Sequence, residues 1–192
     1  MNVVVVILAA GGSTRLGSPK QLLAYRGRSL LRHAAETALA TGCSPVVVVL
    51  GCGAERLKEE LAGLDVVTVE NPEWEKGMGS SIRCGVGRVA PMADGALLML
   101  CDQPLIRTEM LGSLVQAFRE GRPSCQAVAA VYEGTRGVPA VFGRELLTEL
   151  RVLPDEAGAK GLLRRAGAEI VEVLMPEAVT DVDTREEYER LL

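Results

Sequence analysis

A run of small residues with two cations follows the first apolar segment of the chain. It reads Leu8-Ala-Ala-Gly-Gly-Ser-Thr-Arg-Leu-Gly-Ser-Pro-Lys20. Small residues let backbone N–H groups approach an anion closely, Arg15 can hold a phosphate through two hydrogen bonds, and Lys20 adds a point charge. The spacing is neither that of a P-loop nor that of a G-x-G-x-x-G dinucleotide loop. We therefore expect a polyphosphate-binding loop; a glycine-rich turn with solvated charges is the alternative.

Acidic residues stand at two places where a hard cation could bind. Asp102 follows the apolar run 96–101, and Asp181 and Asp183 flank Val182 shortly before the C-terminus. Mg²⁺ usually takes one or two protein carboxylates together with the phosphates of its substrate. The pattern predicts a magnesium site. A turn former at Asp102 and a helix-terminus acid at Asp183 are the alternatives.

A third segment, Asn71-Pro-Glu-Trp-Glu-Lys-Gly-Met-Gly-Ser-Ser-Ile82, follows another apolar run and opens a helix. The N–H groups and hydroxyls at that helix start can read the edge of a base or hold a phosphate. Helix capping alone would also explain Ser80 and Ser81. Trp74, the only tryptophan, is as compatible with packing as with stacking on a base.

The elements that position these segments are apolar, β-branched runs that alternate with stretches of helical spacing. Strands this continuously apolar are buried on both faces, as in a parallel sheet covered by helices. The fold class is therefore α/β with three layers. In such a sheet, ligands bind beyond the carboxyl ends of the strands. The predicted strands lie at 3–8, 46–50, 66–69, 96–101, 127–131 and 170–174.

Helices are predicted at 29–41, where Ser29 caps the first turn, at 108–120, and after Thr184, which forms a capping box with Glu187. The stretches 132–143 and 153–161 are predicted to be long connections. We see no internal repeat and no linker, and we expect residues 1–192 to form one domain.

The composition excludes several classes of protein. The chain has 192 residues, 48% of them hydrophobic, and a net charge of −4, which supplies no basic field for nucleic acid or an anionic membrane. The apolar run 3–10 is too short to span a bilayer, which takes about 20 residues. Five scattered cysteines without a C-x-x-C pair favour a reduced, cytoplasmic protein. The single histidine, His33, excludes a multi-histidine metal site and is more typical of an incidental helical residue.

Taken together, the motifs resemble the MobA-like nucleotidyltransferases, and within them the molybdenum cofactor cytidylyltransferase branch. The first motif is shared by nucleotidyltransferases generally, whereas Asn71-Pro-Glu-Trp74 and Cys101-Asp-Gln-Pro104 point to the molybdopterin branch. The likeness covers nearly the whole chain. It implies a Rossmann-like mixed sheet of about seven strands, mostly parallel, and Mg²⁺-dependent transfer of a nucleoside monophosphate from a nucleoside triphosphate.

The resemblance also implies a set of site residues. Arg15, Lys20 and Asp102 are the implied catalytic residues, and Asp102 and Asp183 would hold Mg²⁺, with Asp181 a weaker candidate. The residues implied to bind the nucleotide are Ala9, Ala10, Gly11, Gly12, Arg15, Lys20, Asn71, Ser80 and Ser81.

The reaction implied is transfer of CMP from CTP to the terminal phosphate of molybdopterin or its molybdenum form, with a molybdoenzyme as candidate partner. A related enzyme that uses GTP or a sugar or polyol phosphate is one alternative, and a non-catalytic molybdenum cofactor carrier is another. Two departures bear on the acceptor. Val138 stands where the family often has histidine, and Lys160 stands where it has arginine, so a bidentate fork is lost.

Overall fold

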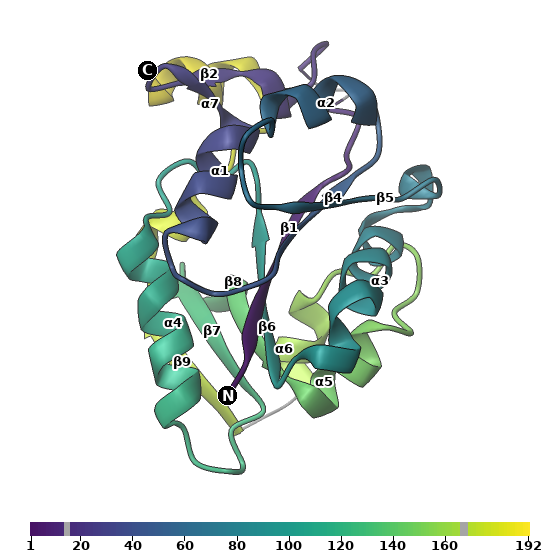
Figure 1. Ribbon diagram of the computed structural model, residues 1–192. Coiled ribbons are helices and arrows are strands. Elements are labelled where there is room, and N and C mark those ends of the chain that lie inside the picture. The colour runs from purple at the N-terminus through teal and green to yellow at the C-terminus, as the bar shows by residue number, and fades with distance from the viewer. Residues whose placement is uncertain (14–15, 166–168) are drawn as a thin grey trace.

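The structure is a computed structural model that describes residues 1–13, 16–165 and 169–192. A seven-stranded sheet forms the middle layer of this described part, in the order β5-β4-β1-β6-β8-β7-β9 (Figure 1). All neighbouring pairs in it are parallel except the two made by β8. The predicted α/β fold with a mostly parallel sheet is confirmed. The strands are β1 (Val3–Ala9), β4 (Val46–Leu50), β5 (Val67–Glu70), β6 (Gly95–Leu100), β7 (Ala127–Tyr132), β8 (Thr135–Gly143) and β9 (Ile170–Leu174).

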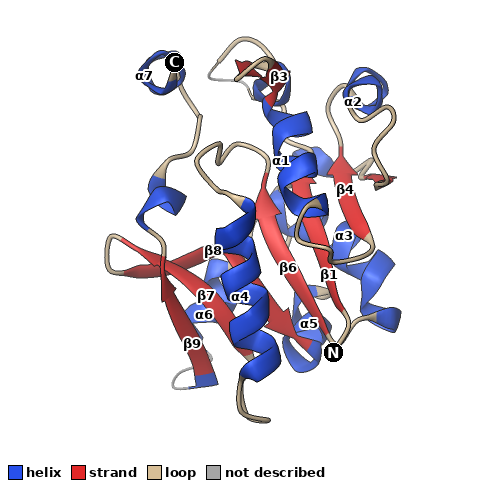
Figure 2. Cartoon of the chain, turned by 60° about the vertical axis from the view of Figure 1, so that its left-hand side comes forward, coloured by secondary structure: helices blue, strands red, loops and turns tan. Residues whose placement is uncertain are grey.

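Helices cover both faces of the sheet. In Figure 2, α1 and α4 lie in front of the strands, and α5 and α6 lie behind them. Val5 and Ile7 of β1 pack in the cluster that includes α1, α2 and α4, whereas Val4 and Val6 pack in the cluster with α3, α5 and α6. Successive side chains of a strand point to opposite faces, so a strand covered on both sides is apolar throughout. The helices are α1 (Leu30–Leu39), α2 (Ala54–Glu60), α3 (Met78–Val89), α4 (Thr108–Glu120), α5 (Arg144–Leu150), α6 (Lys160–Arg165) and α7 (Arg185–Leu191).

Side-chain caps fix the starts of two helices, as the sequence predicts. The Ser29 hydroxyl accepts a hydrogen bond from the backbone N–H of Arg32 at 3.2 Å, at the start of α1. Thr184 and Glu187 form the reciprocal capping box that opens α7. A two-stranded ribbon, β2 (Ala24–Tyr25) with β3 (Arg28–Ser29), precedes α1. No helix within the described ranges is long and apolar enough to cross a membrane.

One predicted connection is a strand. Most of the stretch 132–143 is β8, which lies between β6 and β7 and runs antiparallel to both. Arg136, Gly137 and Pro139 interrupt its apolar pattern, and proline cannot donate a ladder hydrogen bond. The prediction of a loop here is wrong because these residues hide a strand that pairs both with its hairpin neighbour β7 and with the more distant β6.

Candidate active site

The loop after β1 lines a cavity of about 360 Å³ at the carboxyl edge of the sheet. A Cβ on Gly12 would lie 3.0 Å from the Trp74 ring, and one on Gly51 would lie 2.6 Å from the Ala10 carbonyl oxygen. These approaches need glycine, because a side chain would meet the ring or the backbone. Trp74 thus packs against the loops that follow β1 and β4, and its ring also lines the cavity.

Gln21 holds this loop in shape, a role that the sequence analysis missed. Its side-chain amide donates to the carbonyl oxygens of Ala9 at 2.9 Å and Gly11 at 2.7 Å, and the residue is 1% exposed. Buried polar groups need such partners, so the amide is committed to the loop. The partners are backbone atoms, which leave no signature in the sequence.

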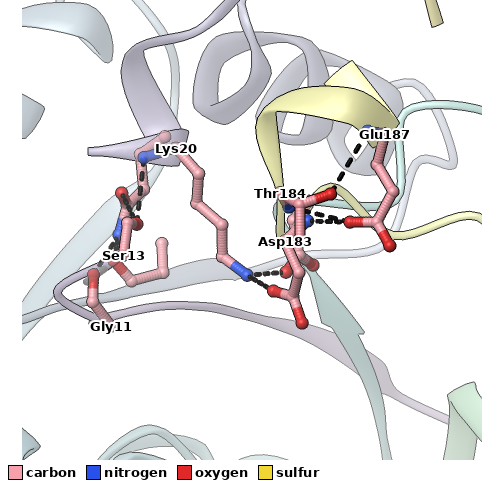
Figure 3. A network of polar contacts seen from close by, with 9 residues as sticks. Gly11, Ser13, Lys20, Asp183, Thr184 and Glu187 are labelled. Carbon is pink, nitrogen blue, oxygen red and sulfur yellow. Dashed lines mark hydrogen bonds and ion pairs between the residues drawn. The ribbon is translucent and has the colours of Figure 1, made fainter. Parts of the chain in front are cut away.

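The Lys20 side chain joins the two acidic segments. Its ammonium Nζ forms ion pairs with Asp102 Oδ2 and with Asp183 Oδ1, the latter at 2.7 Å. Figure 3 shows the side chain extending from the loop toward Asp183. The structure therefore brings together one cation from the N-terminal loop and two carboxylates that are 81 positions apart (183 − 102) in the chain.

Backbone contacts hold the two carboxylates in place. Asp102 follows the end of β6, and its carbonyl oxygen accepts a hydrogen bond from the N–H of Val182 at 3.0 Å. Glu187 Oε2 accepts from the N–H groups of Asp183 and Thr184, at 2.9 and 2.8 Å (Figure 3). The capping box of α7 thus also orients the segment that carries Asp183.

Burial and neighbouring charges both shift the pKa values of the groups in this cluster. Burial lowers the pKa of Lys20, but the carboxylates of Asp102 and Asp183 outweigh it and raise that pKa overall, so the ammonium stays charged. Burial, and then the negative charges of Asp102 and Asp183, raise the pKa of Asp181. Asp181 lines a different cavity, of about 640 Å³, and not the one beside the glycine loop.

These residues fit a divalent cation. Asp102 Oδ1 is buried and has no hydrogen-bond partner in the described part of the protein. A buried acceptor without a hydrogen-bond partner lowers the stability of the folded protein unless a ligand binds to it. Residues 1–13, 16–165 and 169–192 contain no group of three or more His, Cys, Asp or Glu placed to hold a metal. Two carboxylates suit Mg²⁺ when substrate phosphates and water complete its coordination.

Most of the predicted nucleotide-binding residues lie around the cavity, and two do not. Asn71 and Ser80 are buried nearby but are absent from its lining. Arg15 lies outside the described residues, so its role stays a prediction. The predicted metal ligand Asp102 also lines the cavity, whereas Asp183 does not. The predicted nucleotide-binding residues that line it are Ala9, Ala10, Gly11, Gly12, Lys20 and Ser81.

Asn71 organises the segment that leads into α3. Its side-chain nitrogen donates to the hydroxyls of Ser80 at 2.8 Å and Ser81 at 3.0 Å, and its oxygen accepts from the N–H of Glu73 at 3.0 Å. The side chain thus spans the ends of the segment that carries Trp74. Direct contact of Asn71 and Ser80 with a nucleotide stays a prediction.

A smaller apolar cavity of about 100 Å³ adjoins the first and shares Leu8, Met78 and Leu100 with it. Its polar groups come from Tyr132 and from Lys160, whose ammonium donates to the Thr135 hydroxyl at 3.2 Å. The other lining residues are Ile82, Leu98, Gly137, Val138, Gly158 and Ala159.

His33 is away from this chemistry. Its ring packs edge-to-face against Tyr25 at 5.1 Å, and Nε2 lies 3.2 Å from the carbonyl oxygen of Pro104. Burial lowers the pKa of His33. The histidine therefore packs beneath the turn at Asp102–Pro104 and does not line the cavity.

A comparison with known families decides the broader identity. The model of the MobA-like NTP transferase domain matches residues 5–170. The chain belongs to the MobA-like NTP transferase family. The resemblance seen in the sequence motifs is thereby confirmed at the level of the MobA-like nucleotidyltransferase family.

Two full-length relatives of this MobA-like chain stand out. It is 36% identical over 194 residues to nicotine blue oxidoreductase of Paenarthrobacter nicotinovorans, covering 97% of this chain and 95% of that protein. The crystal structure of Rv0371c from Mycobacterium tuberculosis H37Rv is 33% identical with a TM-score of 0.82, covering 100% of this chain and 97% of that one. A complex of Rv0371c with manganese aligns with a TM-score of 0.78 at 31% identity, covering 100% and 98%.

Proposed function

We propose that this protein transfers CMP from CTP to the terminal phosphate of molybdopterin or its molybdenum form and releases pyrophosphate. One observation carries the proposal: Lys20 lies between Asp102 and Asp183 beside a cavity lined by the glycine loop. Backbone N–H groups and an ammonium suit a triphosphate, and two carboxylates suit the divalent cation that accompanies it. The sequence motifs of the molybdopterin branch supply the finer choice of substrates.

Each group has a role in this reaction. The loop at Gly11 and Gly12 binds the triphosphate together with Lys20, and Asp102 and Asp183 would hold Mg²⁺. The metal, when bound, neutralises phosphate charge and lowers the repulsion between the two reacting anions. Lys20 stabilises the negative charge that develops on the departing pyrophosphate.

The reaction needs no general base from the protein. The attacking group is an oxygen of a phosphate monoester, whose second pKa near 6 leaves it ionised at neutral pH. Catalysis then consists of positioning and charge neutralisation, as expected for transfer at phosphorus. His33 packs outside the cavity, in keeping with such a mechanism.

The smaller cavity adjoins the proposed reaction centre, and we propose that part of the acceptor contacts it. It opens beside Leu100, two residues before Asp102, and its walls are aliphatic except for Tyr132 and Lys160. An aromatic ring can stack against a flat heterocycle, and an ammonium can hold an anionic group.

An oxidoreductase is the second candidate, because nicotine blue oxidoreductase is similar over nearly the whole chain. The apolar cavity beside Tyr132 would also suit a flat redox substrate. The ion-paired carboxylates favour the transferase, because hydride transfer does not require a divalent cation beside a loop that binds a triphosphate.

A direct assay separates these functions. The protein with Mg²⁺, CTP and reduced molybdopterin is expected to release pyrophosphate in proportion to the acceptor supplied. A carrier would bind molybdopterin and release none. Reduction of nicotine blue by a reductant supplied in the assay, without pyrophosphate release from any triphosphate, would instead establish the oxidoreductase.

We predict that CTP raises the melting temperature more than GTP, ATP or UTP when Mg²⁺ is present. A ligand at about 100 times its Kd adds about 2.7 kcal/mol of stability, which for a chain of this size is about 5–10 °C. Differential scanning fluorimetry measures the ranking, and quenching of Trp74, which lines the cavity, reports binding independently. A larger shift with GTP would transfer the proposal to guanylyl transfer.

We also predict that Lys20→Ala weakens binding of metal-free CTP about 10- to 100-fold, the range for losing one charge-assisted hydrogen bond. Isothermal titration calorimetry gives the affinity. Lys58→Ala is the matched control, because Lys58 pairs with Glu55 and Glu70 away from the cavity and is expected to bind as the wild type does. Unchanged affinity in Lys20→Ala would remove Lys20 from the nucleotide site.

A further inference from the structure

The ammonium of Lys20 stands where the cation of the proposed reaction would be expected. It contacts one carboxylate oxygen of Asp102 and one of Asp183, the two residues that the metal would need. All three side chains are largely shielded, with exposed fractions of 17% for Lys20, 9% for Asp102 and 31% for Asp183. An ammonium and a divalent cation would repel each other strongly at contact distance. The shielded position between the two carboxylates can therefore hold only one of these two cations at a time.

We propose that Lys20 is a built-in occupant of the cation position, so that a divalent cation binds well only after a triphosphate has drawn the ammonium away. This inference rests on the proposed function and concerns how the same site is regulated. It makes the nucleotide and the cation bind cooperatively, and it keeps the empty enzyme from holding a metal in an unproductive site.

The attachment of Lys20 allows such a movement. Its backbone N–H is fixed to the Ser13 hydroxyl at 3.0 Å, so the base of the side chain stays on the phosphate loop. The same side chain lines the nucleotide cavity. A lysine stem is flexible and its ammonium is a point charge, so it can exchange carboxylate partners for phosphate partners without a change in the backbone.

The ligand count supports the same order of events. The described residues provide no third His, Cys, Asp or Glu to complete a metal site at this place, and Asp181 lines another cavity. A divalent cation that meets only two carboxylates must keep most of its water, and here it must also displace an ion-paired ammonium. Triphosphate oxygens supply the missing ligands and a new partner for Lys20 in one step.

Binding of Mn²⁺ to the nucleotide-free protein tests the inference without any catalytic readout. Electron paramagnetic resonance of free Mn²⁺ gives the affinity for the wild type, Lys20→Met, Lys20→Arg and Lys58→Met. We expect Lys20→Met to bind Mn²⁺ at least about tenfold more tightly than the wild type, because a competing unit charge has gone. Lys58→Met, which removes the same charge elsewhere, and Lys20→Arg, which keeps the charge in place, are expected to stay near the wild-type affinity.

The non-hydrolysable analogue α,β-methylene-CTP supplies the second half of the experiment. It is expected to tighten Mn²⁺ binding by a larger factor in the wild type than in Lys20→Met. In the wild type the nucleotide also draws the competing ammonium away, and the variant lacks that ammonium, so the coupling between nucleotide and cation is weaker. If Lys20→Met proves unfolded by circular dichroism, Lys20→Gln replaces it, because its neutral amide fits the same space.

Two results would overturn the inference: Mn²⁺ affinity in the neutral variants no higher than in the wild type, or equal gains in Lys20→Met and Lys58→Met. The outcome is separable from that of the proposed function. Absence of pyrophosphate release would remove the reaction while tighter Mn²⁺ binding in Lys20→Met stood, and active cytidylyl transfer with unchanged Mn²⁺ binding would remove only the occupancy by Lys20.

Discussion

Asp102→Asn is expected to lower turnover by about 10²-fold or more while the protein stays folded. The substitution keeps the shape of the side chain and removes the charge that faces Lys20 and the cation position. Initial rates of pyrophosphate release, with circular dichroism to confirm folding, measure the effect. CTP affinity is expected to fall less than turnover, because the glycine loop and Lys20 remain.

Asp94→Asn is the matched control. Asp94 immediately precedes β6, the strand that Asp102 follows, and binds Asn2 and Arg144 on the surface. Its amide variant is expected to turn over as the wild type does. If Asp102→Asn keeps full turnover, Asp102 has no catalytic role. If it unfolds under conditions in which the metal-free wild type stays folded, Asp102 is structural.

Gly79→Ala is expected to destabilise the protein by about 3 kcal/mol, or about 6–12 °C in melting temperature. A Cβ on Gly79 would lie 1.9 Å from the carbonyl oxygen of Pro154 and 2.9 Å from that of Asp155. Both obstacles are backbone atoms, so no side-chain rotation relieves them. The hydrogen bond from Gly79 N–H to the Asp155 carbonyl oxygen, at 2.7 Å, would break as well.

The same helix offers a control for Gly79→Ala. Gly87 is exposed, and a Cβ there would meet nothing within 4 Å. Gly87→Ala is expected to raise stability by about 0.5–1 kcal/mol, because alanine is the better helix former. Thermal unfolding of both variants decides the point: a Gly79→Ala protein as stable as Gly87→Ala would contradict the docking of the segment 153–157 against the start of α3.

The sheet was predictable where burial on both faces made the sequence continuously apolar. Every residue of β1 and β4 is buried, and both strands lie where the valine runs predict them. β8 escaped prediction because Gly137 and Pro139 are poor strand residues in isolation. A Cβ at Gly137 would lie 2.1 Å from the Tyr132 hydroxyl oxygen. Glycine is therefore needed at this position because the Tyr132 side chain of the neighbouring strand occupies the space. This contact lies within the β7–β8 hairpin, and the pattern of apolar residues alone does not reveal it.

The sequence predicted which segments contribute to the site, but it did not predict which of their side chains pair with one another. The rule that ligands bind at the carboxyl ends of parallel strands singled out Asp102 and the glycine loop. The sequence placed Lys20 with the phosphates, whereas in the structure its ammonium pairs with Asp102 and Asp183. The backbone hydrogen bond from the N–H of Val182 to the carbonyl oxygen of Asp102 brings the two acidic segments together, and it forms only in the folded chain. The catalytic roles of these residues remain predictions.

One diffraction experiment tests the central claim most directly. Crystals grown with Mn²⁺ and α,β-methylene-CTP are expected to show an anomalous peak in contact with the carboxylates of both Asp102 and Asp183, with Lys20 Nζ moved onto phosphate oxygens. A Mn²⁺ peak elsewhere, with Lys20 still bridging the two carboxylates, would contradict the account.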